Sequence, residues 1–211
     1  AYYNDSKEKG MKTVFSVYAE ASIIPEKLKF KTSYNLDFYF YDARNYAPEH
    51  NVGGSQGNAT SSLSKTYGYG TYHIIDNTLT YSDTKGAHSF SAMLGQSTRM
   101  QYNASLTGRA NSVPGFDEQS KYLVNGSYKN QTTSDAASRY NGLSFFARGT
   151  YNYKDKYLAT VTLRADGSSK YQQKWGFFPS VGLAWNISDE DFMQDQNVFD
   201  FLKLRASWGM L

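Results

Sequence analysis

The chain has 211 residues, of which 22 are Lys or Arg and 19 are Asp or Glu, and both signs are scattered along it. This scatter excludes the basic stripe of a nucleic-acid-binding protein and the acidic tail of a solvating segment. The lack of Cys removes thiol catalysis, disulfides and thiolate metal sites. The 19 Tyr, 13 Phe and 17 Gly, with only 4 Pro, favour strands and turns over helices.

Hydropathy along the chain excludes a helical membrane protein. No run of about 18 apolar residues is present, so no transmembrane helix is predicted. The first residues, 1–5, lack the basic start and apolar core of a signal peptide. A membrane-crossing strand alternates apolar and polar residues, which keeps hydropathy low, so a transmembrane β-barrel remains possible.

Period-two alternation of apolar and polar residues predicts eight strands. The longest run, residues 28–41, carries Leu28, Phe30 and Leu36 on one face and Lys29, Lys31 on the other. Its length exceeds the usual globular strand and suits one that is tilted through a bilayer. The predicted strands cover residues 15–23, 28–41, 75–81, 89–95, 143–153, 157–164, 181–187 and 202–208.

The predicted connections alternate in length. They are short at 24–27, 83–87 and 154–156, and long at 42–70, 100–138 and, less so, 166–174. An up-and-down barrel in an outer membrane has short turns on one side and longer loops on the other. A soluble sandwich has no reason to keep this order. We therefore predict an all-β, antiparallel up-and-down transmembrane barrel wall.

The connection from Ser188 to Phe201 breaks this order because it should be short. Ser188, Asp189, Glu190 and Asp191 predict a single helical turn, with Ser188 as its cap and acidic groups near its start. Capping is a better explanation than catalysis for these acidic residues.

Aromatic residues near the short-turn ends of the apolar face predict an interfacial girdle, since their rings have an apolar body and a polar edge. The alternative is that aromatic residues are simply common in strands. The predicted girdle consists of Tyr81, Tyr151, Tyr153, Tyr157 and Trp185.

Four ordered motifs resemble the SusC/RagA family of TonB-dependent outer-membrane transporters from Bacteroidetes. They are Tyr-Asn-Tyr-Lys-Asp-Lys-Tyr-Leu at 151–158, Leu-Arg-Ala-Asp-Gly-Ser-Ser at 163–169, Trp-Gly-Phe-Phe-Pro-Ser-Val-Gly-Leu-Ala-Trp at 175–185, and Leu-Lys-Leu-Arg-Ala-Ser-Trp-Gly at 202–209. The resemblance implies a barrel of about twenty-two strands, a plug, a TonB box and a SusD-like lipoprotein on the extracellular face. Residues 1–211 would form about eight strands of that single barrel domain, without plug or TonB box.

Catalytic and metal-binding motifs are missing from the sequence. The three histidines, His50, His73 and His88, lack metal-ligand spacing, and the glycine-rich stretch 53–57 lacks the helix and Lys of a phosphate loop. Paired carboxylates for glycoside hydrolysis remain open but have no recognisable frame. The stretch 166–169 fits a turn at a strand end. We predict no enzyme activity, no metal and no cofactor.

Aromatic rings in the long loops are the candidate ligand contacts, because flat rings beside hydroxyls and amides suit sugars or peptide side chains. Packing of the loops against each other is the alternative. The candidate substrate-binding residues are Tyr46, Tyr67, Tyr69, Tyr72 and Trp175. Some charged residues are expected to face the lumen, where they would contact the plug or line the transport path. The alternative is that they pair with each other across strands. These residues are Lys29, Lys31, Asp37, Arg148 and Arg164.

The predicted function is TonB-dependent uptake of an oligosaccharide or peptide nutrient by a multi-pass protein of the bacterial outer membrane. The predicted partners are outer-membrane lipid, the SusD-like lipoprotein and, through the plug, the TonB complex, with no nucleic acid. Two alternatives remain: a soluble or surface-attached all-β glycan-binding or adhesion module, and an independent eight-stranded barrel.

Overall fold

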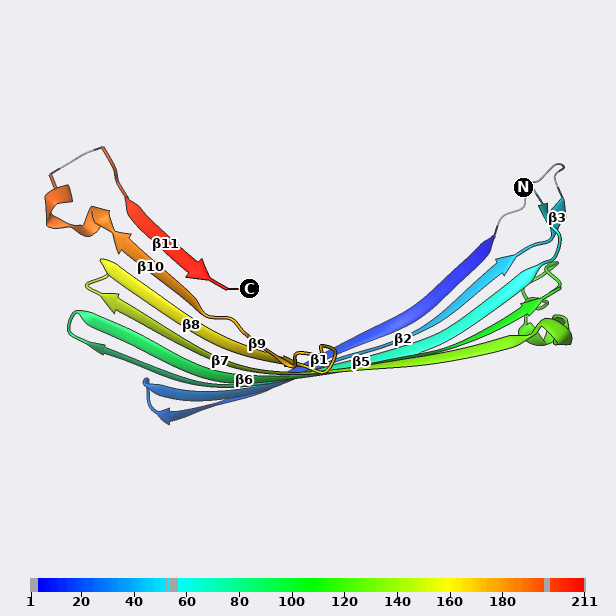
Figure 1. Ribbon diagram of the computed structural model, residues 1–211, viewed down its shortest axis with the longest axis horizontal. Helices are drawn as coiled ribbons and strands as arrows, with labels where there is room; N and C mark the ends of the chain where they lie inside the picture. Colours follow the sequence, from blue (N-terminus) through cyan, green and yellow to red (C-terminus); the bar gives the residue numbers. More distant parts are fainter. Residues whose placement is uncertain (1–3, 52, 54–56, 196–197, 211) are drawn as a thin grey trace. The chain divides into compact units, whose positions relative to one another are not determined.

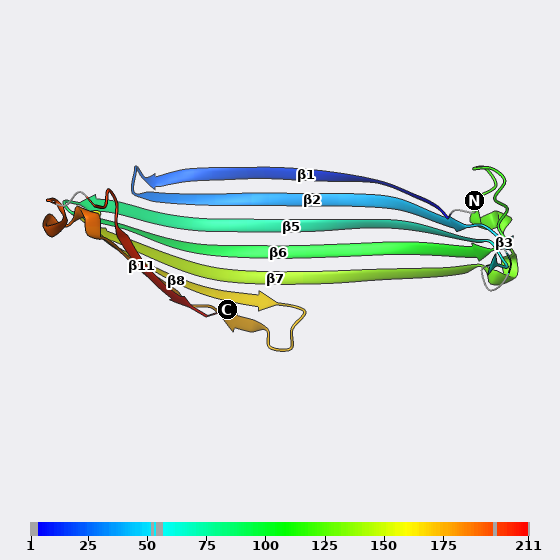
Figure 2. The ribbon, with the colours of Figure 1, turned by 90° about the horizontal axis from the view of Figure 1, so that it is seen from above.

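The computed structural model describes residues 4–51, 53, 57–195 and 198–210. One sheet holds eight strands in chain order, so each strand lies beside its sequence neighbours (Figures 1 and 2). Among the described residues, no helix is long and apolar enough to cross a membrane. The eight strands are β1 (Asp5–Ile24), β2 (Leu28–Ala47), β5 (Ser62–Lys85), β6 (His88–Asn111), β7 (Thr132–Tyr153), β8 (Tyr157–Ser168), β10 (Ser180–Asn186) and β11 (Lys203–Gly209).

Smaller elements fill the connections. β3 (His50–Asn51) pairs with β4 (Gly57–Asn58), and β9 (Trp175–Phe177) pairs with β8 beside the main order. Four short 3-10 helices complete the described structure: η1 (Leu123–Asn125), η2 (Tyr128–Asn130), η3 (Ile187–Asp189) and η4 (Asp191–Met193).

All eight predicted strands are present, but several are far longer than the alternation indicated. β5 and β6 each have 24 residues, and β7 has 22. The predicted loops 42–70 and 100–138 were therefore wrong in extent: the connections run only from 48 to 61 and from 112 to 131. Ser, Thr, Gly and Tyr fill these strand extensions on both sides, so the sequence shows no apolar contrast there although the backbone ladder continues.

Tight turns form at the predicted short connections. Lys27 N donates to Ile24 O at 3.1 Å, and Lys156 N donates to Tyr153 O at 3.0 Å. In the turn between β7 and β8, Lys154 and Asp155 have φ of 53° and 56°. Two successive positive φ angles are the conformation of a type I′ turn, whose twist matches that of the flanking strands.

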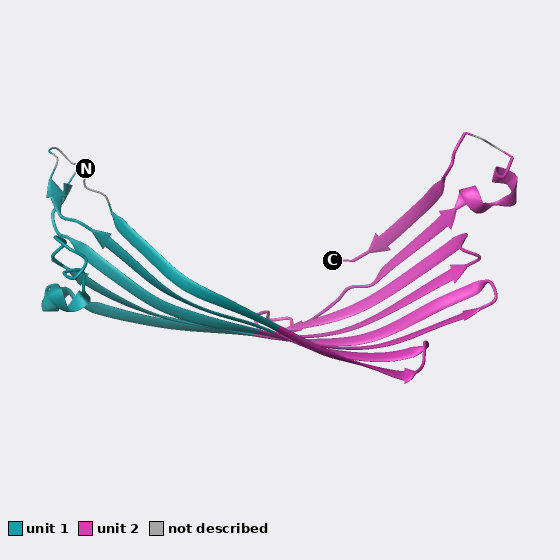
Figure 3. Cartoon of the chain, turned by 180° about the vertical axis from the view of Figure 1, so that it is seen from behind, with its two compact units in different colours: residues 1–15, 36–72, 101–139 teal, residues 16–35, 73–100, 140–211 magenta. Residues whose placement is uncertain are grey.

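Two compact units divide the strands along their length (Figure 3). Unit 1 comprises residues 1–15, 36–72 and 101–139, and unit 2 comprises residues 16–35, 73–100 and 140–211. Among the described residues, every buried hydrophobic side chain belongs to unit 1: Tyr46, Leu63, Ala110 and Val113. Unit 2 therefore holds its strands together without an apolar core of its own in the described part of the chain.

Unit 1 also contains an ion-pair network that ties the 112–131 connection to β1 and β2. Arg44 lies 2.7 Å from Asp5 and 2.8 Å from Glu118, and Lys121 lies 2.7 Å from Asp5. The cation side chains are only 13% and 12% exposed. Hydrogen bonds from Arg44 and Lys7 hold the pKa of Glu118 well below its usual range.

Protonation of this network should loosen the connection. Because the folded-state pKa of Glu118 is depressed, the contribution of this carboxylate is complete above the unfolded pKa and declines as pH falls below about 5. We expect Glu118→Gln to lower the hydrogen-exchange protection of residues 112–131 at pH 7 and to weaken its pH dependence. Glu49→Gln is the control, since Glu49 forms no ion pair within the described residues. Equal protection in both variants would contradict this role.

Candidate functional site

Strand pairing in unit 2 aligns β7, β8, β10 and β11 residue by residue. Tyr153 pairs with Tyr157, Tyr157 with Trp185, and Trp185 with Leu204. Directly paired residues project on the same side of a sheet. This row therefore belongs to one side, which we call the apolar face. Its other members are Phe145, Ala147, Gly149, Tyr151, Ala159, Val161, Leu163, Val181, Leu183, Ala206 and Trp208.

The opposite side of these strands is the polar face. Ser144 pairs with Asp166, and Arg148 pairs with Thr162. The other members of the polar face are Phe146, Thr150, Asn152, Leu158, Thr160, Arg164, Gly182, Ala184, Lys203, Arg205 and Ser207. The period-two pattern of the sequence is therefore realised as two chemically different surfaces of a single layer.

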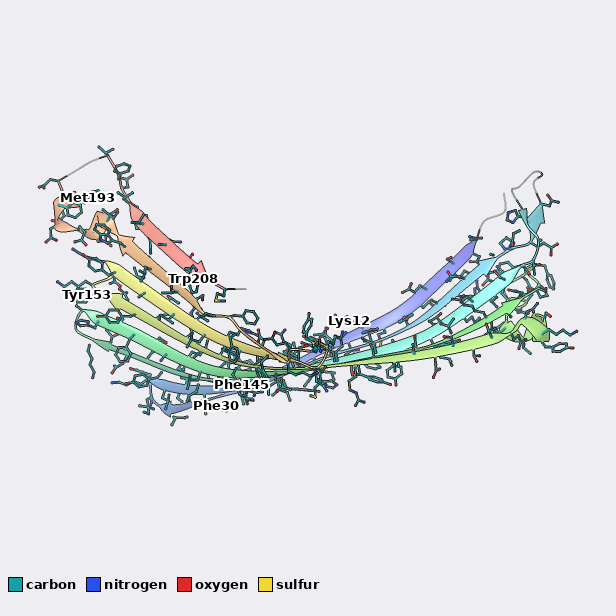
Figure 4. The ribbon with its side chains drawn as sticks, in the orientation of Figure 1. Lys12, Phe30, Phe145, Tyr153, Met193 and Trp208 are labelled. Atoms are coloured by element: carbon teal, nitrogen blue, oxygen red, sulfur yellow. The ribbon has the colours of Figure 1, made fainter. Side chains whose placement is uncertain are left out.

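The apolar face is open. Leu163, Leu183, Leu204 and Trp208 are 55%, 58%, 59% and 60% exposed, and Figure 4 draws the side chains standing off the strands, with Phe145, Tyr153 and Trp208 labelled. Soluble monomers rarely expose contiguous apolar patches of more than a few hundred Å². A lipid phase is the environment in which such a surface on one side of a sheet is favourable.

Polar side chains on the apolar side of β2, β5 and β6 satisfy one another. Thr32 donates to Asn77 at 2.8 Å, Asn77 donates to Gln96 at 2.8 Å, and Gln96 donates to Thr98. An unpaired amide in an apolar environment costs several kcal/mol, roughly 2 to 7. The chain of mutual bonds removes that cost and lets polar residues occur on this side.

Aromatic rings form a row at the short-turn ends. His88 and Tyr153 have ring centroids 4.8 Å apart, Tyr153 and Tyr157 stack at 6.3 Å, and Tyr157 and Trp185 stack at 6.4 Å. Tyr81 packs on Phe90 at 5.8 Å at the neighbouring turn. The structure thus brings the five predicted girdle residues to the same end of unit 2, with Tyr151 hydrogen-bonded to His88.

Glu190 anchors the 188–201 connection to this aromatic row. Its carboxylate accepts hydrogen bonds from Tyr157 OH at 2.6 Å, Trp185 Nε1 at 2.9 Å and Lys156 Nζ at 3.2 Å. The side chain is 14% exposed. These hydrogen bonds lower the pKa of Glu190 to about 2, and the bond from Tyr157 has the largest effect. The carboxylate therefore stays charged at neutral pH and fixes the connection to β8 and β10.

The capping prediction for this segment was wrong. Ser188 lies inside η3, and the cap positions of η3 and η4 are Asn186 and Glu190, neither of which makes a side-chain capping bond. Ser188 instead bonds the backbone of Leu202. The Glu190 carboxylate bonds the side chains of Trp185, Tyr157 and Lys156 and not the backbone of a helix end. These donors lie on other strands and turns, so the spacing of residues in the sequence could not indicate them.

Charged residues expected in the lumen are mostly paired, but with partners the sequence did not indicate. Lys29 lies 3.6 Å from Glu20, Asp37 lies 2.8 Å from Lys12, and Lys31 lies 4.7 Å from the ring centroid of Tyr18 (Lys12 is labelled in Figure 4). Arg164 binds Asp166. Arg148 makes no hydrogen bond or ion pair within the described residues.

Glycines beside aromatic rings are close-packing positions that sequence reasoning missed. A Cβ on Gly68 would lie 2.3 Å from the Tyr41 ring, one on Gly70 2.6 Å from Tyr39, and one on Gly95 2.1 Å from Phe146. Each ring therefore occupies the space that a side chain at the glycine would fill. An aromatic residue one strand away from a glycine is the signal that could have identified these contacts.

The five candidate substrate-binding residues are not brought together. Tyr46 is 6% exposed and donates to Val113 O, and Trp175 stacks on Phe145 at 6.2 Å on the apolar face. Tyr67 and Tyr69 are 54% and 47% exposed, and Tyr69 packs on Tyr102.

Tyr72 lies on the other side of β5 from Tyr67 and Tyr69. Tyr72 is two residues from Gly70 along the strand, so both project to the same side of the sheet. A Cβ on Gly70 would meet Tyr39 and Asn103 on that side. Its ring therefore belongs to the side of the sheet on which Tyr39 and Asn103 lie.

The three histidines lie within hydrogen-bond distance of neighbouring oxygen atoms. His73 Nδ1 lies 2.8 Å from Tyr34 OH, His88 Nδ1 lies 2.6 Å from Tyr151 OH, and His50 Nδ1 lies 3.1 Å from Pro48 O. Within the described ranges, no group of three or more His, Cys, Asp or Glu residues could hold a metal ion.

These features define the class of protein: an antiparallel barrel wall with one apolar and one polar surface. Residues 6–210 match the family described as "TonB dependent receptor-like, beta-barrel", and the chain belongs to that family.

Three relatives illustrate the similarity. The chain is 37% identical over 166 residues to TonB-dependent receptor P26 of Formosa agariphila, covering 74% of the chain and 16% of the relative. It is 35% identical over 133 residues to TonB-dependent receptor SusC of Bacteroides thetaiotaomicron, covering 62% and 13%. A chain in the RagAB peptide importer in its "closed-closed" state superposes with a TM-score of 0.84 at 18% identity, covering 98% and 23%.

These matches confirm the SusC/RagA resemblance and the barrel fold. They also show that the chain spans less than a quarter of the length of the proteins it matches.

Proposed function

We propose that this chain is part of the wall of an outer-membrane transporter that takes up a nutrient, an oligosaccharide or a peptide, in a TonB-dependent manner. The observation that carries the proposal is the pairing of an open apolar face with a polar face across one layer of strands. The apolar face would contact lipid and the polar face the lumen. The names of the relatives, TonB-dependent receptors and a peptide importer, support the same activity.

Residues 1–211 would contribute to a single barrel domain and carry no catalytic residue. Energy coupling would proceed through a plug and a TonB-contacting segment elsewhere in the full protein, and a SusD-like lipoprotein would cap the loop end. The aromatic row held by Glu190 would mark the periplasmic interface, since amphipathic rings favour the headgroup level.

Among the five candidate substrate contacts, the geometry favours Tyr72. It lies on the side of β5 that meets Tyr39 and Asn103, opposite to the side of Tyr67 and Tyr69. Tyr46 and Trp175 are engaged with their own wall, which supports a role in holding the loops. Tyr67 and Tyr69 keep exposed rings that remain candidate contacts for ligand or lipoprotein.

The face assignment predicts opposite outcomes for adjacent residues of β10. Leu183→Lys would place an ammonium group in lipid at a cost of up to about 2–4 kcal/mol. We expect less folded protein in the outer membrane, measured by the heat-modified mobility of the extracted full-length protein. The control, Ala184→Lys, faces the lumen and should leave the folded fraction unchanged. Equal losses in both variants would refute the assignment of the two faces.

The transport proposal predicts a selective growth defect. A strain that lacks the full-length gene should fail on at least one oligosaccharide or peptide, supplied as the sole carbon or nitrogen source. Growth on glucose and ammonium should stay normal because small solutes diffuse through porins. Loss of TonB should reproduce the defect. Growth equal to wild type on every oligosaccharide and peptide tested would contradict the proposal.

A further inference from the structure

A cavity of about 650 Å³ opens in unit 2 where β8 ends at the 169–174 connection, beside the middle of β7. Residues of the polar face form its floor, and the connection forms its rim. The side chains that matter for its chemistry are Arg99, Ser144, Arg164, Asp166, Tyr171 and Lys174.

Arg164 and Asp166 neutralise one another in the floor. Arg164 Nε donates to both carboxylate oxygens of Asp166, at 2.8 and 2.7 Å, and Nη2 donates to Ser144 Oγ at 3.2 Å. The guanidinium also lies 5.7 Å from the ring centroid of Phe146. This pair is held on several sides and contributes no net charge to the cavity.

Two further cations, Arg99 and Lys174, also line the cavity, and Arg99 lies close enough to Asp166 to interact with it electrostatically. Arg99 is exposed and makes no hydrogen bond or ion pair within the described part of the chain. Lys174 Nζ donates only to the backbone oxygen of Ser169, at 3.3 Å. Asp166 is the one carboxylate among the lining residues and is already paired. The cavity is therefore positively charged.

The rim is preformed by backbone hydrogen bonds. Ser168 N donates to Lys174 O at 2.9 Å, which closes the connection on itself. Ser169 N donates to Asn141 O, and Asn141 N donates to Ser169 Oγ, both at 2.9 Å. A ligand would thus meet a surface that requires little ordering, which favours affinity.

We propose that this cavity binds a carboxylate group of the imported ligand, with Arg99 and Lys174 as its cationic contacts. The inference rests on the proposed transport function and specifies the chemistry of its ligand. Arg forms paired hydrogen bonds with a carboxylate, and such charge-assisted bonds are stronger than neutral ones. Beside them, the ring of Tyr171, 69% exposed, and the amides of Gln172 and Gln173 suit a sugar ring or peptide backbone.

Binding to the purified full-length transporter tests the site. The probes are hexagalacturonate and tetraglutamate, which carry carboxylates on a sugar and a peptide, and neutral maltohexaose. We expect at least one acidic probe to bind more tightly than maltohexaose, with affinity falling as salt rises. Arg99→Gln should weaken that binding about tenfold or more. Which acidic probe binds identifies the source of the carboxylate.

The matched control is Arg148→Gln, because Arg148 is also an unpaired cation of the polar face but does not line the cavity. It should leave the affinity unchanged, and both variants should keep the heat-modified mobility of the folded protein. Absence of binding by both acidic probes, or equal weakening by both substitutions, would overturn the site. A nutrient-specific growth defect without acidic-probe binding would reject only this site, whereas the absence of any growth defect would reject the transport function.

Discussion

The structure depends on one constraint: a single layer of strands must satisfy its backbone hydrogen bonds laterally while its two sides meet different surroundings. Successive residues point to opposite sides, so the register of β7, β8, β10 and β11 decides which chemistry each side presents. A slip of one residue would move Leu183 and Trp185 to the polar face. Because each of these strands pairs with its neighbours along the chain, few alternative registers are open to it.

Other features follow from the same constraint. Since the described residues of unit 2 form no apolar core, side chains stabilise the layer through contacts between adjacent strands. Phe146 lies over Gly95, Asn77 bonds Gln96, and Glu190 collects donors from the ends of β8 and β10. Each contact fixes neighbouring strands without filling an interior, which leaves the polar face available for solute.

Sequence alone predicted the eight strands, the three tight turns and the family, because alternation, turn residues and ordered motifs are local signals. The sequence overestimated the length of the loops. In the extensions of β5 and β6, Ser, Thr and Gly occur on both sides of the strand, so apolar and polar residues do not alternate clearly there. It missed the partners of Glu190 and the cation Arg99 because those depend on which strands lie side by side. Trp175 could not be assigned to a face until the pairing of β9 with β8 was known.

The central claim, that one face meets lipid and the other water, is tested most directly by spin labels placed singly at positions 181 to 185 of the full-length protein in lipid vesicles. The account predicts that labels at Val181, Leu183 and Trp185 are accessible to oxygen and shielded from a water-soluble nickel complex, with the reverse at Gly182 and Ala184. Accessibility that does not alternate along β10, or that alternates in the opposite phase, would contradict it.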